Sequence, residues 1–134
     1  MAIAYEWRGE FANPELNTLH AAGFDHEPTD DDWWNRVHRH SLGWVCARDG
    51  AALVGFVNVA WDGGTHAFIL DTVVAAHARR QGIGAHLIRL AAQEATAAGA
   101  EWLHVDFEPH RSAFYLNHCG FTPTAAGLMA LPPP

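Results

Sequence analysis

The sequence of 134 residues contains no lysine, so all eight of its basic residues are arginines. A P-loop needs a Gly-Lys-Ser/Thr sequence to hold the phosphates of a nucleotide, and the missing lysine excludes this class of site. Cysteine is also scarce, with only Cys46 and Cys119 present. Two cysteines make no disulfide framework and their spacing fits no zinc motif, so both are expected to be small apolar side chains.

Long apolar runs are absent as well. No stretch approaches the roughly 18 residues that a transmembrane helix needs. Acidic residues occur early in the chain, and the pattern of a secretory signal peptide is missing. We therefore expect a cytoplasmic protein with no membrane partner. The length and the hydrophobic fraction of 49% suit a single domain over residues 1–134 with a core of its own.

Charge is limited to 17% of the residues and is unevenly distributed, with a net value of −7. Residues 1–40 hold eight acidic side chains and three arginines, and such a chain is not expected to bind nucleic acid. Residues 72–93 hold three arginines and no acid, which predicts an anionic ligand there. The acidic run 30–32 is either solvated loop surface or part of a binding site for a cationic substrate. Trp33 and Trp34 would line that site with aromatic rings or, alternatively, pack in the core.

Hydrophobic periodicity and turn residues predict an α/β protein in which a sheet with mixed strand directions is flanked by helices. Gly99 is expected to end the long helix that starts at Gly82. The predicted helices cover residues 13–22, 32–40, 82–98 and 111–118, and the predicted strands cover residues 43–48, 52–61, 66–74, 102–107 and 127–131.

The most informative segment is Arg79-Arg80-Gln81-Gly82-Ile83-Gly84, which joins a predicted strand to a predicted helix. Glycines let backbone N–H groups approach an anion, and a helix N-terminus offers unpaired donors and the positive end of its dipole. A dinucleotide fingerprint would need a third glycine at position 87, which is Leu87. The segment therefore predicts a phosphate-binding turn of another kind.

Residues 74–84 resemble the acyl-CoA-binding motif of the GNAT superfamily of N-acetyltransferases, Arg/Gln-x-x-Gly-x-Gly/Ala after a strand that ends in valine. Phe114-Tyr115 followed by Cys119-Gly120-Phe121 is similar to the second motif of that family. The resemblance covers roughly residues 44–122. It implies the GNAT fold, with a mixed, mostly antiparallel sheet of about six to seven strands flanked by helices.

The resemblance implies direct transfer of an acetyl group from acetyl-CoA, the donor co-substrate, to a primary amine of a small molecule or peptide within a ternary complex. A non-catalytic acyl-CoA-binding or sensing module is the alternative. Thr72, Val73 and Val74 would pair through their backbone with the pantetheine arm, and a bulge there would aim an N–H at the acetyl carbonyl. The backbone of Gln81, Gly82, Ile83, Gly84 and Ala85, with charge from Arg79 and Arg80, would hold the pyrophosphate.

Tyr115 is implied to protonate the departing thiolate. It lies five residues before Gly120, whereas the commoner spacing in the family is four, which would put Leu116 at the usual place. Either the helix contains an extra residue or Tyr115 is a core aromatic. A second departure is Glu108, which stands where many members have an asparagine that touches pantetheine.

An amine acceptor needs a base, because an amine with the pKa of lysine is only about 0.1% neutral near pH 7.4. Asp71 is one candidate, acting directly or through water. His104 and Asp106 are another, since they share one face of a predicted strand; alternatively they only bond to each other or face water. No histidine spacing suits a metal. The acidic N-terminal half favours a cationic amine, and an exposed edge strand near the C-terminus would allow a homodimer.

Overall fold

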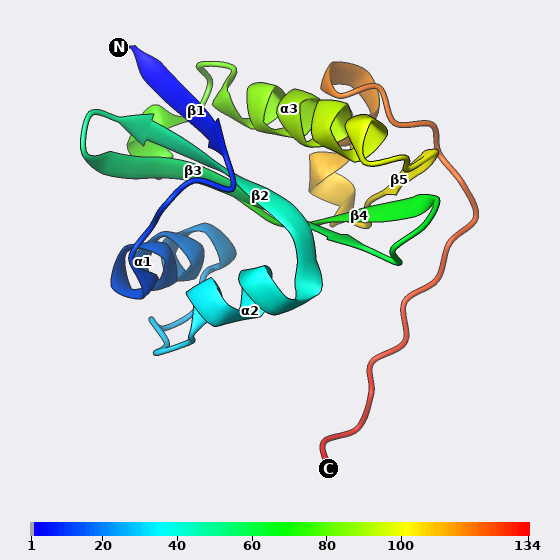
Figure 1. Ribbon diagram of the computed structural model, residues 1–134, viewed down its shortest axis with the longest axis horizontal. Helices are drawn as coiled ribbons and strands as arrows, with labels where there is room; N and C mark the ends of the chain where they lie inside the picture. The colour runs from blue at the N-terminus through cyan, green and yellow to red at the C-terminus, as the bar shows by residue number, and fades with distance from the viewer. Residues whose placement is uncertain (1) are drawn as a thin grey trace.

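The computed structural model describes residues 2–134, which are built on a five-stranded sheet in the order β1-β2-β3-β4-β5 (Figure 1). Neighbouring strands are antiparallel except β4 and β5, which are parallel. The α/β class with mixed strand directions is therefore confirmed, with five strands rather than six to seven. The strands are β1 (Ile3–Trp7), β2 (Ser41–Asp49), β3 (Ala52–Trp61), β4 (His66–Val74) and β5 (Trp102–His104).

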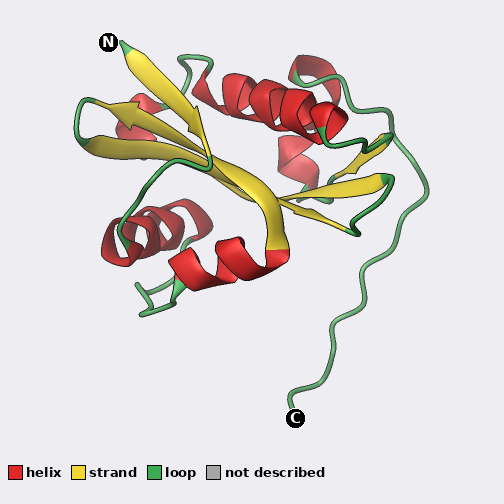
Figure 2. Ribbon diagram, in the orientation of Figure 1, coloured by secondary structure: helices red, strands yellow, loops and turns green. Residues whose placement is uncertain are grey.

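Helices cover both faces of the sheet (Figure 2). α1 (Asn13–Phe24) and α2 (Trp33–His40) lie on one face, and α3 (Ile83–Ala97) lies on the other. Three shorter helices are also present. η1 (Ala76–Ala78) and η2 (Pro109–Arg111) are 3-10 helices, and η3 (Ala113–His118) is a π-helix. The chain thus forms a helix–sheet–helix sandwich.

Local sequence explains where these elements begin and end. The carboxylate of Asp32 accepts a hydrogen bond from the backbone N–H of Asn35, as expected of a residue that caps α2. Gly99 follows the last residues of α3 with a φ of +99°, the conformation expected of the glycine after a helix. Both predicted boundaries are confirmed.

Two apolar clusters hold the layers together, one on each face of the sheet. Val57, Val59 and Leu87 belong to the cluster beneath α3, whereas Trp44 and Phe56 belong to the cluster beneath α1 and α2. Trp33 is only 3% exposed and Trp34 packs edge-on against Phe11. Of the alternatives for these tryptophans, core packing is the one observed for Trp33.

A bulge in β4 changes the side of the sheet that its side chains face. Asn58 pairs with Leu70 and Phe56 pairs with Val73, so Asp71 and Thr72 lie together opposite Val57. Asp71 has a φ of +58°, in the left-handed region. Before the bulge Ile69 is buried in the α3 cluster, and after it Val73 is buried in the α1 cluster. The bulge expected in this strand is present.

The sequence prediction was wrong at the two ends of the chain. β1 was not predicted, although Ile3, Tyr5 and Trp7 alternate with exposed residues. The strand predicted over residues 127–131 is not formed: no strand follows β5 in the described chain, and the tail extends away from the sheet (Figure 1). An apolar stretch becomes a strand only if a neighbour accepts its backbone hydrogen bonds. The strand predicted over residues 102–107 ends at His104.

Close packing of α1 on β4 yields a stability prediction at Gly23. A Cβ there would lie 2.2 Å from Cγ2 of Val73, which is buried and β-branched. Alanine gains up to about 1 kcal/mol of helix propensity, but overpacking costs about 1–3 kcal/mol. We expect Gly23→Ala to lower the free energy of unfolding, measured by urea denaturation.

Gly127→Ala is the matched control, since nothing lies within 4 Å of a Cβ at Gly127. Its unfolding midpoint should equal that of the wild type. A Gly23→Ala protein that is as stable as the wild type, or more so, would contradict the packing described for α1 and β4.

Candidate functional site

The main cleft has a volume of about 480 Å³ and lies between the second half of β4, the start of α3 and η3. It exists because β4 and β5 separate. The two strands pair only from His66 with Trp102 to Phe68 with His104, while β4 continues to Val74. In the described chain, no strand covers this part of the outer edge of β4. Its backbone groups are therefore free to pair with an extended ligand.

Most residues predicted to bind the cofactor line this one cleft. They are Thr72, Val73, Val74, Arg79, Arg80, Gly82, Ile83, Gly84 and Ala85. Gln81 belongs to the same turn but does not line the cleft. The structure thus brings the edge of β4 and the turn before α3 together, as the order of the motif implied.

The turn before α3 is shaped by backbone conformations that expose N–H groups. Arg80 has a φ of +63°, and Gly82, the residue that caps α3, has a φ of +80°. The N–H groups in the first turn of a helix have no intrahelical acceptor, and here Ile83, Gly84 and Ala85 present this end to the cleft. A Cβ at Gly84 would lie 3.0 Å from the ring of Phe114, so glycine allows this close approach.

The electrostatics of the cleft favour an anion. Arg79, Arg80 and Arg111 line it, and no aspartate or glutamate is among its described lining residues. The Arg79 Nε–H donates to the backbone oxygen of Val74 at 3.2 Å, which orients its guanidinium beside the end of β4. Arginines and helix N–H groups together provide the donors that phosphate groups need.

Tyr115 lies in the cleft on the π-helix η3. The Cys119 N–H donates to the backbone oxygen of Phe114 at 2.9 Å, five residues earlier, so the turn contains one residue more than an α-helical turn. This extra residue accounts for the unusual spacing between Tyr115 and Gly120. Tyr115 is 6% exposed and its ring stacks on Phe107, with centroids 4.9 Å apart.

The Tyr115 phenol keeps its proton at neutral pH. Burial raises its pKa above the ordinary value, and the nearby Thr72 hydroxyl offsets part of this rise. Thr72 Oγ1 is buried and has no hydrogen-bond partner. Tyr115 thus carries a phenol proton at the wall of the cleft, near the unpartnered hydroxyl of Thr72.

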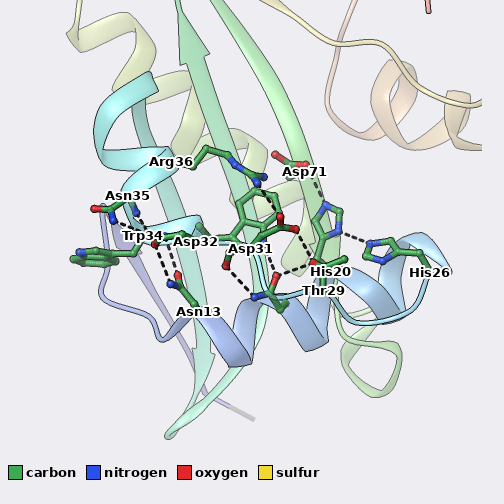
Figure 3. Close-up of polar contacts among 12 residues, drawn as sticks. Asn13, His20, His26, Thr29, Asp31, Asp32, Trp34, Asn35, Arg36 and Asp71 are labelled. Carbon is green, nitrogen blue, oxygen red and sulfur yellow. Dashed lines mark hydrogen bonds and ion pairs between the residues drawn. The ribbon is translucent and has the colours of Figure 1, made fainter. Parts of the chain in front are cut away.

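The candidate bases lie in different places. Asp71 contacts His20 of α1, with 3.1 Å between Asp71 Oδ1 and His20 Nε2 (Figure 3). Asp71 also accepts from the Asn58 Nδ2–H at 3.3 Å. His104 lies on the outer part of the sheet, where its Nε2 is 2.7 Å from His66 Nδ1 and its ring stacks on Phe68. The structure therefore does not pair His104 with Asp106.

His20 and Asn58 were missed by sequence reasoning. His20 and Asp71 are 51 residues apart, and only the packing of α1 on β4 brings them together. Asp106 lies near enough to Tyr115 to raise its pKa slightly. Glu108 stands at the N-cap position of the short helix η2, and its side chain makes no capping hydrogen bond.

Other kinds of site are not found among residues 2–134. No group of three or more histidine, cysteine or acidic side chains is arranged to hold a metal ion. No helix in the described part of the chain is long and apolar enough to cross a membrane. Cys46 is buried, which raises the pKa of its thiol to about 12. Its thiol is therefore a packing group rather than a nucleophile.

Comparison with family models identifies the chain. Residues 4–121 match the model of the acetyltransferase (GNAT) family, which is most of the chain. The protein belongs to the GNAT acetyltransferase family. The matched segment contains all of β1 except Ile3, the bulge of β4, the turn before α3 and Tyr115. A search of curated proteins found no match.

Solved structures show the same fold. A GNAT family acetyltransferase from Streptococcus pneumoniae is 22% identical, with a TM-score of 0.79 over 98% of each chain. AAC(6')-Iy, solved with a CoA-linked acetylneamine bisubstrate analogue, is 15% identical, with a TM-score of 0.80 over 99% of each chain. Glucosamine-6-phosphate N-acetyltransferase from Arabidopsis thaliana is 13% identical, with a TM-score of 0.74 over 96% of this chain and 98% of that chain.

Proposed function

We propose that this GNAT protein transfers an acetyl group from acetyl-CoA to a primary amine within a ternary complex. The observation that carries the proposal is the cleft, where an unpaired strand edge, a helix N-terminus with arginines and a protonated tyrosine line one cavity. These are the parts needed to hold a long phosphate-bearing thioester and to release its thiol. AAC(6')-Iy, which has the same fold, was solved with a CoA-containing analogue.

The cleft supports one orientation of the donor. The pyrophosphate would bind the N–H groups at the start of α3, from Gln81 to Ala85, with charge from Arg79 and Arg80. The pantetheine arm would then run along the free edge formed by Thr72, Val73 and Val74, as an extra strand does. This path brings the thioester to the β4 bulge and to Tyr115, which line the same cavity.

The chemistry follows from these neighbours. A backbone N–H of the bulge would donate to the acetyl carbonyl and stabilise the oxyanion that forms when the amine attacks. The C–S bond then breaks, and Tyr115 would donate its proton to the leaving thiolate. Tyr115 would recover a proton from the nitrogen of the tetrahedral intermediate. One further proton leaves the ammonium before attack, so each turnover releases one proton to solvent.

A cationic amine is the acceptor class that we propose. Eight acidic residues lie within residues 1–40, and α1 and α2 of this segment cover the sheet face opposite α3. Asp31 and Asp71 both belong to this face (Figure 3). Two neighbours of the same fold are described with aminated sugars, acetylneamine and glucosamine 6-phosphate.

The proposal is tested by CoA release with neamine, glucosamine 6-phosphate, spermidine and a lysine peptide at saturating acetyl-CoA. We expect turnover with at least one cationic amine. Tyr115→Phe should lower kcat by about 10²-fold or more, the size of a general-acid effect, while CoA affinity measured by calorimetry changes little.

Tyr5→Phe is the matched control, because Tyr5 stacks on His86 outside the cleft, and its rate should equal that of the wild type. Acetyl-CoA binding without any acetylated product would instead favour the non-catalytic acyl-CoA-binding module. Unchanged kcat in Tyr115→Phe would remove this residue from the mechanism.

We further propose that the protein forms a homodimer through its C-terminal tail. Leu128, Met129 and Leu131 are between 81% and 85% exposed, and Trp102 on the edge strand β5 is 67% exposed. An apolar tail and an uncovered edge on one chain are complementary, so the tail of a second copy would pair with β5.

Light scattering after size exclusion tests the dimer. The full chain should be dimeric, and a chain ending at residue 126 should be monomeric. A chain ending at Leu131, which keeps the apolar residues and lacks only the prolines, should remain dimeric. A monomeric full chain at about 0.1 mM would contradict the interface, since stable interfaces have micromolar or stronger affinity.

A further inference from the structure

A chain of hydrogen bonds leads from the β4 bulge to the protein surface through two histidines (Figure 3). Asp71 Oδ1 lies 3.1 Å from His20 Nε2, and His20 Nδ1 lies 2.9 Å from His26 Nε2. His26 Nδ1 in turn lies 2.7 Å from the backbone oxygen of Glu27. Both ring nitrogens of both histidines are therefore engaged.

The two ends of this chain fix how many protons it holds. The carbonyl of Glu27 and the carboxylate of Asp71 only accept, so His26 Nδ1 and His20 Nε2 must each carry a proton. The contact between His20 Nδ1 and His26 Nε2 needs a third proton. Two neutral imidazoles supply only two. The complete network thus contains one imidazolium. Loss of its extra proton leaves either two lone pairs facing each other between the rings or, if His20 keeps its proton on Nδ1, a free Nε2 beside Asp71.

Solvent exposure increases along this series of hydrogen bonds from the bulge to the surface. The side chains of His20 and Asp71 are 17% and 26% exposed, whereas His26 is exposed. Thr72, the next residue of the bulge, lines the cleft, so the backbone of Asp71 adjoins the proposed path of the thioester while its carboxylate faces α1. The ring of His20 is held between Phe24, at 4.4 Å, and Trp33, at 5.0 Å.

Other polar groups around His20 are paired or neutral. Asp31 bonds to Thr29 and forms an ion pair with Arg36 of α2 at 3.3 Å. These contacts, together with a weaker influence of His20, lower the pKa of Asp31. From β3, the neutral side chain of Asn58 donates to the other carboxylate oxygen of Asp71. Asp71 and His26 are therefore the groups that exchange a proton with His20.

We propose that Asp71, His20 and His26 form a proton relay that deprotonates the acceptor amine and delivers the proton to solvent. This inference rests on the proposed acetyl transfer. When the network lacks its extra proton and His20 holds its own proton on Nδ1, Nε2 is free, and an ammonium at Asp71 would give one proton to it. The Nδ1 proton of His20 then passes to His26 Nε2, His26 releases its Nδ1 proton to water, and exchange with water returns both rings to the starting tautomers. The N–H bond breaks, its electron pair stays on nitrogen, and the neutral amine attacks the thioester.

The first test needs no substrate. Long-range ¹H–¹⁵N spectra of the ¹⁵N-labelled full chain report which imidazole nitrogens carry protons between about pH 5 and pH 9. We expect His20 and His26 to lose one proton in a single shared step, with His26 Nδ1 protonated throughout. In Asp71→Asn the midpoint should move to lower pH, because an amide does not stabilise an imidazolium. His40→Asn, at an exposed histidine outside the relay, should leave the step unchanged.

The second test uses the fastest amine of the panel above. Asp71→Asn should lower kcat by about 10²-fold or more, with the KM for acetyl-CoA unchanged. His26→Asn should turn over more slowly, and free imidazole in the buffer should restore its rate, because a diffusing base replaces the missing outer member. A purely structural role of His26 would give no such rescue.

The outcomes separate this inference from the function on which it rests. Independent titration of the two rings, or two neutral rings throughout, would overturn the relay even in an active enzyme. The relay would also be overturned if free imidazole did not raise the turnover rate of His26→Asn. A shared titration step with no product from any amine would instead refute the acetyl transfer. If a variant fails to fold, the titration of the wild-type chain still decides between these results.

Discussion

The bulge that places Asp71 and Thr72 opposite Val57 determines which face of the sheet each later side chain of β4 meets. In a regular strand, Asp71 would face α3 and Thr72 would face α1, because successive side chains alternate. With the extra residue, Asp71 meets His20 of α1, and Thr72 faces Tyr115. The two bulge residues thus have their side chains on opposite faces of the sheet, with the Asp71 carboxylate toward α1 and the Thr72 hydroxyl toward the cleft.

The proposed role of β4 also depends on the part of its outer edge that no other strand pairs with. β5 pairs with β4 only as far as Phe68 and His104, and the backbone beyond is left for another partner. α3 starts at this open edge, because the turn from Ala76 to Gly82 returns the chain to the cleft, which the first residues of α3 line. The donor half of the proposed site is therefore mainly backbone, and the acceptor half is mainly side chains.

This division explains how much could be predicted from the sequence. The turn from Arg79 to Gly84 was predictable because its glycines and arginines are contiguous and report a local backbone shape. The spacing of Tyr115 from Gly120 left its position open until the π-helix was seen. His20 and Asn58 carry no such local pattern, since tertiary packing alone brings α1, β3 and β4 to one point. The strand predicted over residues 127–131 failed for a related reason, because composition does not reveal whether a neighbouring strand exists.

Amide chemical-shift changes on adding CoA to the ¹⁵N-labelled chain test the central claim most directly, because the proposed contacts are mainly with backbone N–H groups. The account predicts that the largest changes fall on two segments of the cleft, residues 72–74 and 81–85, with little change on α2 or the C-terminal tail. Changes that are absent, or that are largest on α2 or the tail, would contradict a CoA site between β4 and α3.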